Sequence, residues 1–216
     1  MKRLFFIIIC LSLSVFSSFS QEAKDILDKA AEAFQNAGNT SISFVVNIQD
    51  KNQGASESFE GKIDLQGEKF HLDTPDLESW FDGTSQWTLQ KEWDEVTISN
   101  PSKEDVRMLN PNMVFDLYKT GSNAKYIGRK TDIKNRDVYE IELNPKNDKG
   151  DIVRILVDIS TKSYFIFKIE IEFKNGVKNI FYIDKYVIKT NFLSDHFVFK
   201  NDNYPDVEVI DLRNNE

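Results

Sequence analysis

Few side chains in this sequence could act as acids, bases or metal ligands near neutral pH, because its 216 residues include two histidines and one cysteine. His71 lies in the run Phe70-His71-Leu72-Asp73, whose alternation points its ring away from the apolar side chains. We therefore interpret His71 as a solvated strand residue. His196 follows Asp195, and such a pair could act as a base and its orienting carboxylate. No nucleophile motif accompanies the pair, so a capping or turn role is favoured.

Other catalytic signatures are missing from the sequence. It contains no Gly-x-Ser-x-Gly motif and no glycine-rich phosphate loop. The run from Asn147 to Asp151 resembles a calcium loop but lacks the full ligand spacing and the distal glutamate, so a hairpin turn explains it better. A carboxylate pair for glycoside hydrolysis stays open among the scattered acidic residues. We predict no enzymatic activity, no catalytic residue, no metal site and no cofactor.

The alternation of apolar residues predicts a chain built mainly from strands. A helix over residues 22–36 ends near Gly38. Alternating strands then follow, and a short helical segment with a Met- and Leu-rich stripe interrupts them between residues 101 and 121. Further strands are expected at 138–143, 152–158, 164–173 and 178–188, with an Asn175-Gly176 hairpin, and a last extended segment carries Phe197, Phe199, Val207 and Val209. We expect one strongly curved antiparallel sheet of about ten or eleven strands.

The first twenty residues have the basic, apolar and small-residue order of a secretory signal peptide. Cleavage is expected between Ser20 and Gln21, which would leave residues 21–216 as one exported domain. Cys10 follows Ile9 inside the apolar run, a context that disfavours a lipid anchor, so the mature chain would form no disulfide. Without Lys2 and Arg3 the net charge falls from −8 to −10. This acidity argues against nucleic acid and anionic lipid surfaces as partners.

The aromatic residues of the strands have two interpretations that the sequence leaves open. Stripes of Phe and Trp on strands usually form a solid core, but a large curved sheet with few helices could instead enclose a cavity for an apolar ligand.

Several short motifs, in their order along the chain, resemble the periplasmic outer-membrane lipoprotein carrier family, LolA. Asp82-Gly83-Thr84-Ser85-Gln86-Trp87 looks like the strand entry of that family. A helix with a Ser-rich exit and a strand with Glu60-Gly61-Lys62-Ile63 precede this motif. Asn100-Pro101, the Met-rich segment and Leu143-Asn144-Pro145-Lys146 follow it, so the resemblance covers nearly the whole mature chain.

The resemblance implies a mainly β (α+β) fold: an unclosed, strongly curved antiparallel β-barrel with short helices as a lid over a hydrophobic cavity. It implies a monomeric periplasmic carrier that binds lipoprotein acyl chains. Such a carrier receives its cargo from an inner-membrane lipoprotein-releasing transporter and delivers it to an outer-membrane acceptor. This chain has no arginine between Arg3 and Arg107, so it lacks the lid-bonding arginine of the family's better-known members.

The acyl cavity is expected to be lined by strand residues and by the Met-rich helix. These residues are Phe44, Val46, Ile48, Phe59, Ile63, Phe70, Leu72, Trp80, Trp87, Leu89, Met108, Met113, Val114 and Leu117. Two other functions remain open: a carrier of another lipid or pigment on the same fold, and a solid-cored periplasmic sensor or interaction module.

Overall fold

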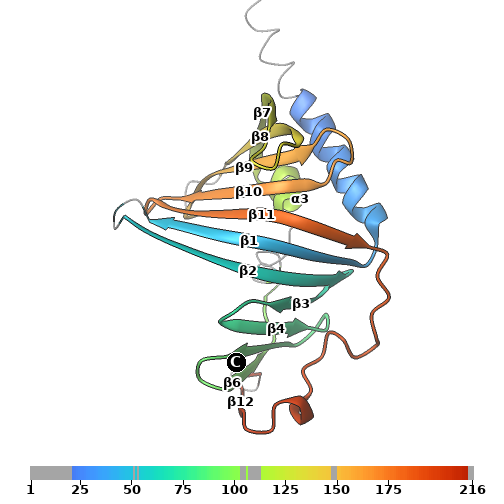
Figure 1. Ribbon diagram of the computed structural model, residues 1–216, viewed down its shortest axis with the longest axis vertical. Helices are drawn as coiled ribbons and strands as arrows, with labels where there is room; N and C mark the ends of the chain where they lie inside the picture. Colours follow the sequence, from blue (N-terminus) through green and yellow to red (C-terminus); the bar gives the residue numbers. More distant parts are fainter. Residues whose placement is uncertain are drawn as a thin grey trace, which may run out of the picture. The chain divides into compact units, whose positions relative to one another are not determined.

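The computed structural model shows a mostly β protein with 53% of its residues in strands and a large sheet that is not closed into a barrel (Figure 1). It describes residues 21–50, 52, 54–102, 106, 113–146 and 150–213. The predicted signal peptide, Met108 and the turn at residues 147–149 lie outside this part of the chain. None of the described helices is long and apolar enough to cross a membrane. The chain divides into two compact units, which are described in turn.

The first unit contains residues 1–34, 50–54 and 114–180. Its helices are most of the N-terminal helix at residues 21–37 and most of α3 (Met113–Thr120). Its strands are β7 (Ser122–Thr131), β8 (Asp137–Pro145), β9 (Ile152–Ser160), β10 (Ile166–Phe173) and the start of β11 (Val177–Ile188). They pair in the order β11-β10-β9-β8-β7, and β7 to β10 are antiparallel.

The two faces of the first unit's sheet differ sharply in chemistry. The register aligns Ile141 with Val157 and Val157 with Ile169, so one face is apolar. The N-terminal helix reaches this face through Lys29, whose ammonium lies 5.7 Å from the centre of the Tyr164 ring, and that ring stacks on Tyr139. The other face carries a charged ladder, defined here as Lys130, Glu140, Glu142, Arg154, Asp158, Lys168, Glu170, Glu172 and Lys178.

The second unit contains residues 35–49, 55–113 and 181–216. Its strands are β1 (Thr40–Asp50), β2 (Ala55–Gln66), β3 (Lys69–Asp73), β4 (Leu77–Phe81), β5 (Gln86–Gln90), β6 (Glu95–Ser99), β12 (Glu208–Asp211) and the rest of β11, with a 3-10 turn at Asn201–Asn203. Their order is β12-β6-β5-β4-β3-β2-β1-β11. Strands β2 to β6 pair antiparallel, whereas β12 lies parallel to β6.

Register fixes which side chains share a face in the second unit. Leu65 lies opposite Phe70, and Phe70 opposite Phe81, on what we call the apolar face. On the reverse, called the histidine face, one row of paired residues crosses five strands. This row is Asp64, His71, Trp80, Trp87 and Ile98.

The structure confirms the mainly β, unclosed fold but differs from the expected elements in three places. Strands β4 and β7 were not predicted. In β4 the adjacent Trp80 and Phe81 obscure the alternation, and β7 is interrupted by a register shift between Tyr126 and Gly128. The last segment is not one extended strand. It turns through Asn201–Asn203 before β12, and β12 breaks the expected antiparallel pattern.

Candidate functional site

The apolar face of β1 to β3 holds the largest group of the residues expected to bind acyl chains. Phe44, Val46, Ile63 and Phe70 are buried there. Gly61 allows their close packing, because a Cβ at this position would lie 2.5 Å from Cζ of Phe44. The Phe44 ring also contacts Phe181 of β11, with 6.4 Å between the ring centres. This part of the second unit is therefore a continuous hydrophobic layer.

The same face becomes more exposed toward the end of β1 and the beginning of β2. Ile48 and Phe59 are partly exposed there, as is Leu72 on β3. The hydrogen bond from Ser58 to Asn47 shows that these two polar residues share the reverse face, which leaves Ile48 and Phe59 on the apolar one. An apolar molecule could contact the layer first through these half-exposed side chains.

The expected lining residues do not all lie on one face. Trp80 pairs with Trp87, and both belong to the histidine face together with Leu89. Phe70 of β3 and Ile63 of β2 lie on the opposite face of the sheet. A single cavity against this sheet cannot contact both groups. The reason is that alternation assigns residues to faces within one strand, whereas only the pairing register shows which faces of neighbouring strands coincide.

Three of the residues expected to line the cavity, Met113, Val114 and Leu117, belong to helix α3. Met113 and Val114 are buried, and Leu117 is partly exposed. Phe115 of the same helix contacts Phe34 of the N-terminal helix, with 6.3 Å between ring centres. Met108 lies outside the described residues.

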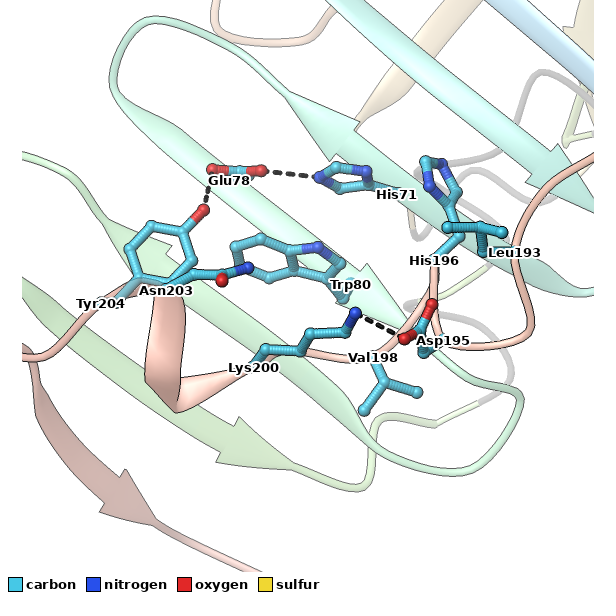
Figure 2. Close-up of a pocket in the computed structure, with 10 residues that line it drawn as sticks. All are labelled: His71, Glu78, Trp80, Leu193, Asp195, His196, Val198, Lys200, Asn203 and Tyr204. Atoms are coloured by element: carbon cyan, nitrogen blue, oxygen red, sulfur yellow. Dashed lines mark hydrogen bonds and ion pairs between the residues drawn. The ribbon is translucent and has the colours of Figure 1, made fainter.

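A pocket of about 210 Å³ lies on the histidine face (Figure 2). Its floor is Trp80, and its wall is residues 190–207, which we call the C-terminal segment. In Figure 1 this segment follows β11 and runs past β3 and β4 toward β12. Phe199 and Tyr204 of the segment pack on Trp80 with ring-centre distances of 5.4 and 5.8 Å. The chain itself thus covers the tryptophan that was expected to contact cargo.

His71 is not the solvated residue that the sequence suggested. Its ring stacks on Trp80 at 5.1 Å between centres, and its Nε2 lies 2.7 Å from Oε1 of Glu78. Glu78 also accepts a hydrogen bond from the Tyr204 hydroxyl at 2.9 Å. Burial opposes ionisation of Glu78, but the hydrogen bonds from His71 and Tyr204 outweigh it and lower the pKa of this carboxyl. Burial and the bond to Glu78 raise the pKa of Tyr204 to about 12.

His196 is oriented by a residue far away in the sequence. Its Nε2 lies 2.8 Å from Oδ2 of Asp64, whereas the neighbouring Asp195 forms an ion pair with Lys200 at 2.5 Å. The structure therefore does not form the His196–Asp195 pair, and the backbone N–H of His196 donates to the carbonyl of Leu193 at 3.1 Å, as the favoured turn role implies. Asp64 is buried, which disfavours its charge, but hydrogen bonds from Ser41, Lys62 and His196 together lower its pKa.

Sequence reasoning missed Asp64, Glu78 and Tyr204 as members of this cluster. Asp64 was inconspicuous because it occupies one polar position in an alternating strand, as acidic residues of exposed sheet faces do. The signal that could have identified it is its alignment with His71 and Trp80, which requires the register of two hairpins. In the described structure this cluster holds the C-terminal segment against the sheet.

The family comparison matches most of the chain. A family model described as outer membrane lipoprotein carrier protein LolA covers residues 13–176. No curated protein matches the sequence.

Solved structures of similar fold have low sequence identity to this chain. An uncharacterized conserved protein from Thermus thermophilus superposes with a TM-score of 0.56 at 9% identity, over 88% of this chain and 99% of that one. LprF from Mycobacterium bovis gives 0.49 at 14% identity, over 80% and 97%. A chain of the Pseudomonas aeruginosa MucA/MucB complex gives 0.43 at 13% identity, over 83% and 61%. The first of these supports the fold, and identities this low say nothing specific about ligands.

Proposed function

Because this chain belongs to the outer membrane lipoprotein carrier family LolA, we propose that it is a periplasmic carrier that binds the acyl chains of lipoproteins. It would take them from an inner-membrane transporter and pass them to an outer-membrane acceptor. The observation that carries the proposal is the apolar face of β1 to β3, which combines a buried hydrophobic layer with the half-exposed Ile48 and Phe59.

The proposed contact residues are those of the apolar face of the second unit: Phe44, Val46, Ile48, Phe59, Ile63, Phe70 and Leu72. Met113, Val114 and Leu117 of α3 are a separate candidate contact. Trp80, Trp87 and Leu89 are left out because they lie on the histidine face beside Phe199 and Tyr204 of the C-terminal segment. Methionine suits such a role because its flexible thioether repacks around chains of different shape.

Energetics limit how such a carrier can hold its cargo. Each buried methylene is worth about 0.8 kcal/mol, so several long acyl chains would exceed the ceiling of about −20 kcal/mol for non-covalent binding. A carrier must also release its cargo. Partial burial of the chains, or the cost of separating packed side chains, therefore has to offset much of the gain.

Photocrosslinking tests the proposal with two aromatic positions on opposite faces. Phe59 and Trp87 are both partly exposed, so each can be replaced by p-benzoylphenylalanine with little loss of packing. We expect lipoprotein adducts from the Phe59 position after irradiation in cells and none from the Trp87 position. Adducts from Trp87 alone, or equal adducts from both, would contradict the assignment of cargo to the apolar face.

The identity of the crosslinked molecule separates the proposal from its alternatives. A lipoprotein adduct supports the carrier function proposed here. An adduct with a free lipid would instead indicate a carrier of another lipid, and an adduct with an unlipidated protein would indicate an interaction module.

A further inference from the structure

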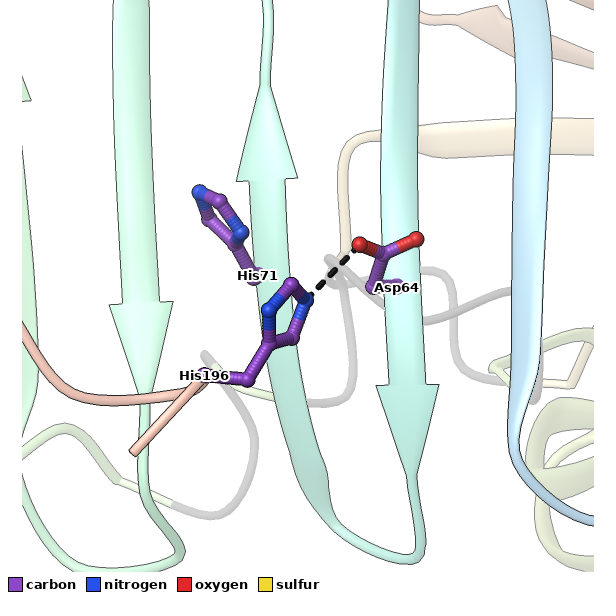
Figure 3. Close-up of side chains that lie close together, drawn as sticks. All are labelled: Asp64, His71 and His196. Atoms are coloured by element: carbon purple, nitrogen blue, oxygen red, sulfur yellow. Dashed lines mark hydrogen bonds and ion pairs between the residues drawn. The ribbon is translucent and has the colours of Figure 1, made fainter. Parts of the chain in front are cut away.

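Three side chains that commonly bind metals meet on the histidine face (Figure 3). Asp64 comes from β2, His71 from β3 and His196 from the C-terminal segment, and one ligand atom of each lies within 4.8 Å of the others. We propose that these three residues bind one divalent transition-metal ion, for which Zn²⁺ is the best-fitting probe. The site belongs wholly to the second unit and goes beyond the proposed carrier function.

The donor set favours a transition metal over Mg²⁺ or Ca²⁺. Two imidazoles and one carboxylate suit zinc and its neighbours, whereas hard cations take oxygen ligands. The carboxylate of Glu78 can only accept a hydrogen bond, so the Nε2 of His71 must donate, and Nδ1 of the neutral ring keeps its lone pair. A carboxylate that orients a metal-binding histidine in this way is a common outer partner in zinc sites.

A second observation points to a ligand at Asp64. This residue is 2% exposed, and within the described part of the chain its Oδ1 has no hydrogen-bond partner. Nζ of Lys62 at 3.0 Å and Nε2 of His196 at 2.8 Å both approach Oδ2. The Ser41 hydroxyl, the third donor near this carboxylate, does not satisfy Oδ1. A buried carboxylate oxygen without a partner costs free energy, and a bound cation would remove that cost.

The geometry requires only small adjustments. Ligand atoms of a tetrahedral zinc site lie about 3.3 Å apart, because metal–ligand bonds are about 2.0–2.1 Å long. His196 and Asp64 would separate slightly as the ion replaces the imidazole proton between them. Lys62 can withdraw, because its side chain is 54% exposed. Both histidines line the pocket of Figure 2, so a fourth ligand such as water can enter from there.

The consequence would be a metal clip on the C-terminal segment. Asp64 and His196 are 132 residues apart in the sequence. An ion bound by both, and by His71, would fix the segment over Trp80 more firmly than the hydrogen bond does. Metal binding would therefore stabilise the folded protein in proportion to metal affinity and concentration.

Calorimetric titration with Zn²⁺ tests the site in the full chain, purified without a polyhistidine tag and stripped of metal. We expect one ion per chain and a rise in melting temperature. Replacing a ligand by an uncharged residue of similar size (Asp64→Asn, His71→Gln or His196→Gln) should weaken binding at least about 100-fold, and Glu78→Gln about 10- to 100-fold. Asp158→Asn, which changes a similarly buried aspartate of the first unit, should leave the affinity unchanged.

Cobalt provides a readout that does not depend on the variants remaining folded. Co²⁺ bound by two imidazoles and a carboxylate with few waters should absorb visible light far more strongly than the hexaaqua ion. A pale, aqua-like spectrum, no binding of Zn²⁺, or binding that all the variants leave unchanged would each overturn the proposal. Because lipid binding enters none of these measurements, the metal site and the carrier function stand or fall separately.

Discussion

Among the described residues, each unit has one buried aspartate, and the two carboxylates have different partners. Asp158 in the charged ladder and Asp64 on the histidine face both have side chains that are 3% exposed. Asp158 faces two ammonium groups, Lys130 at 3.0 Å and Lys168 at 3.7 Å. Asp64 has the imidazole of His196, the hydroxyl of Ser41 and the half-exposed Lys62. Lysines fix permanent charge in place, whereas an imidazole can exchange its proton for a metal ion.

The pKa directions of the two aspartates differ accordingly. Burial raises the pKa of Asp158, and the attraction of Lys168 and Lys130 only partly opposes it. At Asp64 the hydrogen bonds from Ser41, Lys62 and His196 overcome burial and lower the pKa. Three hydrogen bonds outweigh burial at Asp64, whereas the single hydrogen bond from Lys130 and the two ammonium charges do not outweigh it at Asp158.

Replacing one lysine near each aspartate should lower the free energy of unfolding. The loss should be larger near Asp158 than near Asp64, and it is the largest effect predicted here. Lys168→Met leaves Asp158 and Glu170 close together with fewer cations, so we expect the free energy of unfolding to fall by about 2 kcal/mol. Lys62→Met should cost less than about 0.5 kcal/mol, because this lysine is half exposed and His196 still donates to Asp64. Urea unfolding measures both values. Equal losses would show that the two aspartates depend on lysine to the same extent.

The unfolding free energy declines as the pH falls, and two substitutions in the charged ladder, Glu170→Gln and Asp158→Asn, should change the slope of this decline in opposite directions. The pKa of Glu170 is lowered, because hydrogen bonds and charges from Lys178 and Lys168 outweigh burial. Its contribution is therefore present above its unfolded pKa near 4.5 and is lost as pH falls through the lower folded pKa. Glu170→Gln should flatten the decline in unfolding free energy between about pH 5 and 3.

Asp158 has the opposite sign because its folded pKa lies above its unfolded value of 3.8. Its stabilising contribution is present below pH 3.8 and is lost as pH rises through the folded pKa, so acidification restores it. Asp158→Asn removes this gain in stability on acidification, so the unfolding free energy should decline more steeply as the pH falls. Urea titrations at several pH values compare the slopes, and a change in the same direction for both variants would contradict the assignments.

A further comparison takes one tyrosine from each unit. Burial, with Asp28 for Tyr118 and Glu78 for Tyr204, raises the pKa of each hydroxyl to about 12. Both should ionise after the ordinary tyrosines in an absorbance titration at alkaline pH. Tyr204→Phe and Tyr118→Phe should each remove one late-titrating group, and Tyr204→Phe should cost about 1 kcal/mol through the lost bond to Glu78. An unchanged late phase in either variant would show that its tyrosine titrates normally.

Much of the fold follows from the sequence, because alternation marks strands such as β1 and β9 and Asn175-Gly176 marks the hairpin between β10 and β11. Strand β7 was not predicted, because basic residues and the register shift at Gly128 interrupt its alternation of apolar and polar residues. The family resemblance came from short motifs whose order the family model supports over residues 13–176.

The site was less predictable than the fold for a physical reason. Alternation within β3 correctly placed His71 and Phe70 on opposite faces of the sheet. It could not show that Trp80 of β4 lies on the same face as His71 and not on the face of Phe70. That depends on hairpin register. Nor could local sequence show that His196 reaches Asp64, since the contact spans 132 residues and depends on where the C-terminal segment folds back.

The central claim, that this member of the LolA family carries lipoproteins by their acyl chains, is tested most directly by native mass spectrometry of the protein released from its own cell envelope. The account predicts a fraction of molecules whose mass exceeds that of the chain by one intact, triacylated lipoprotein. This fraction should shrink in a Gly61→Ala variant, whose new Cβ displaces the Phe44 ring on the apolar face. A protein that is recovered only empty, or only with an unlipidated partner, would contradict the claim.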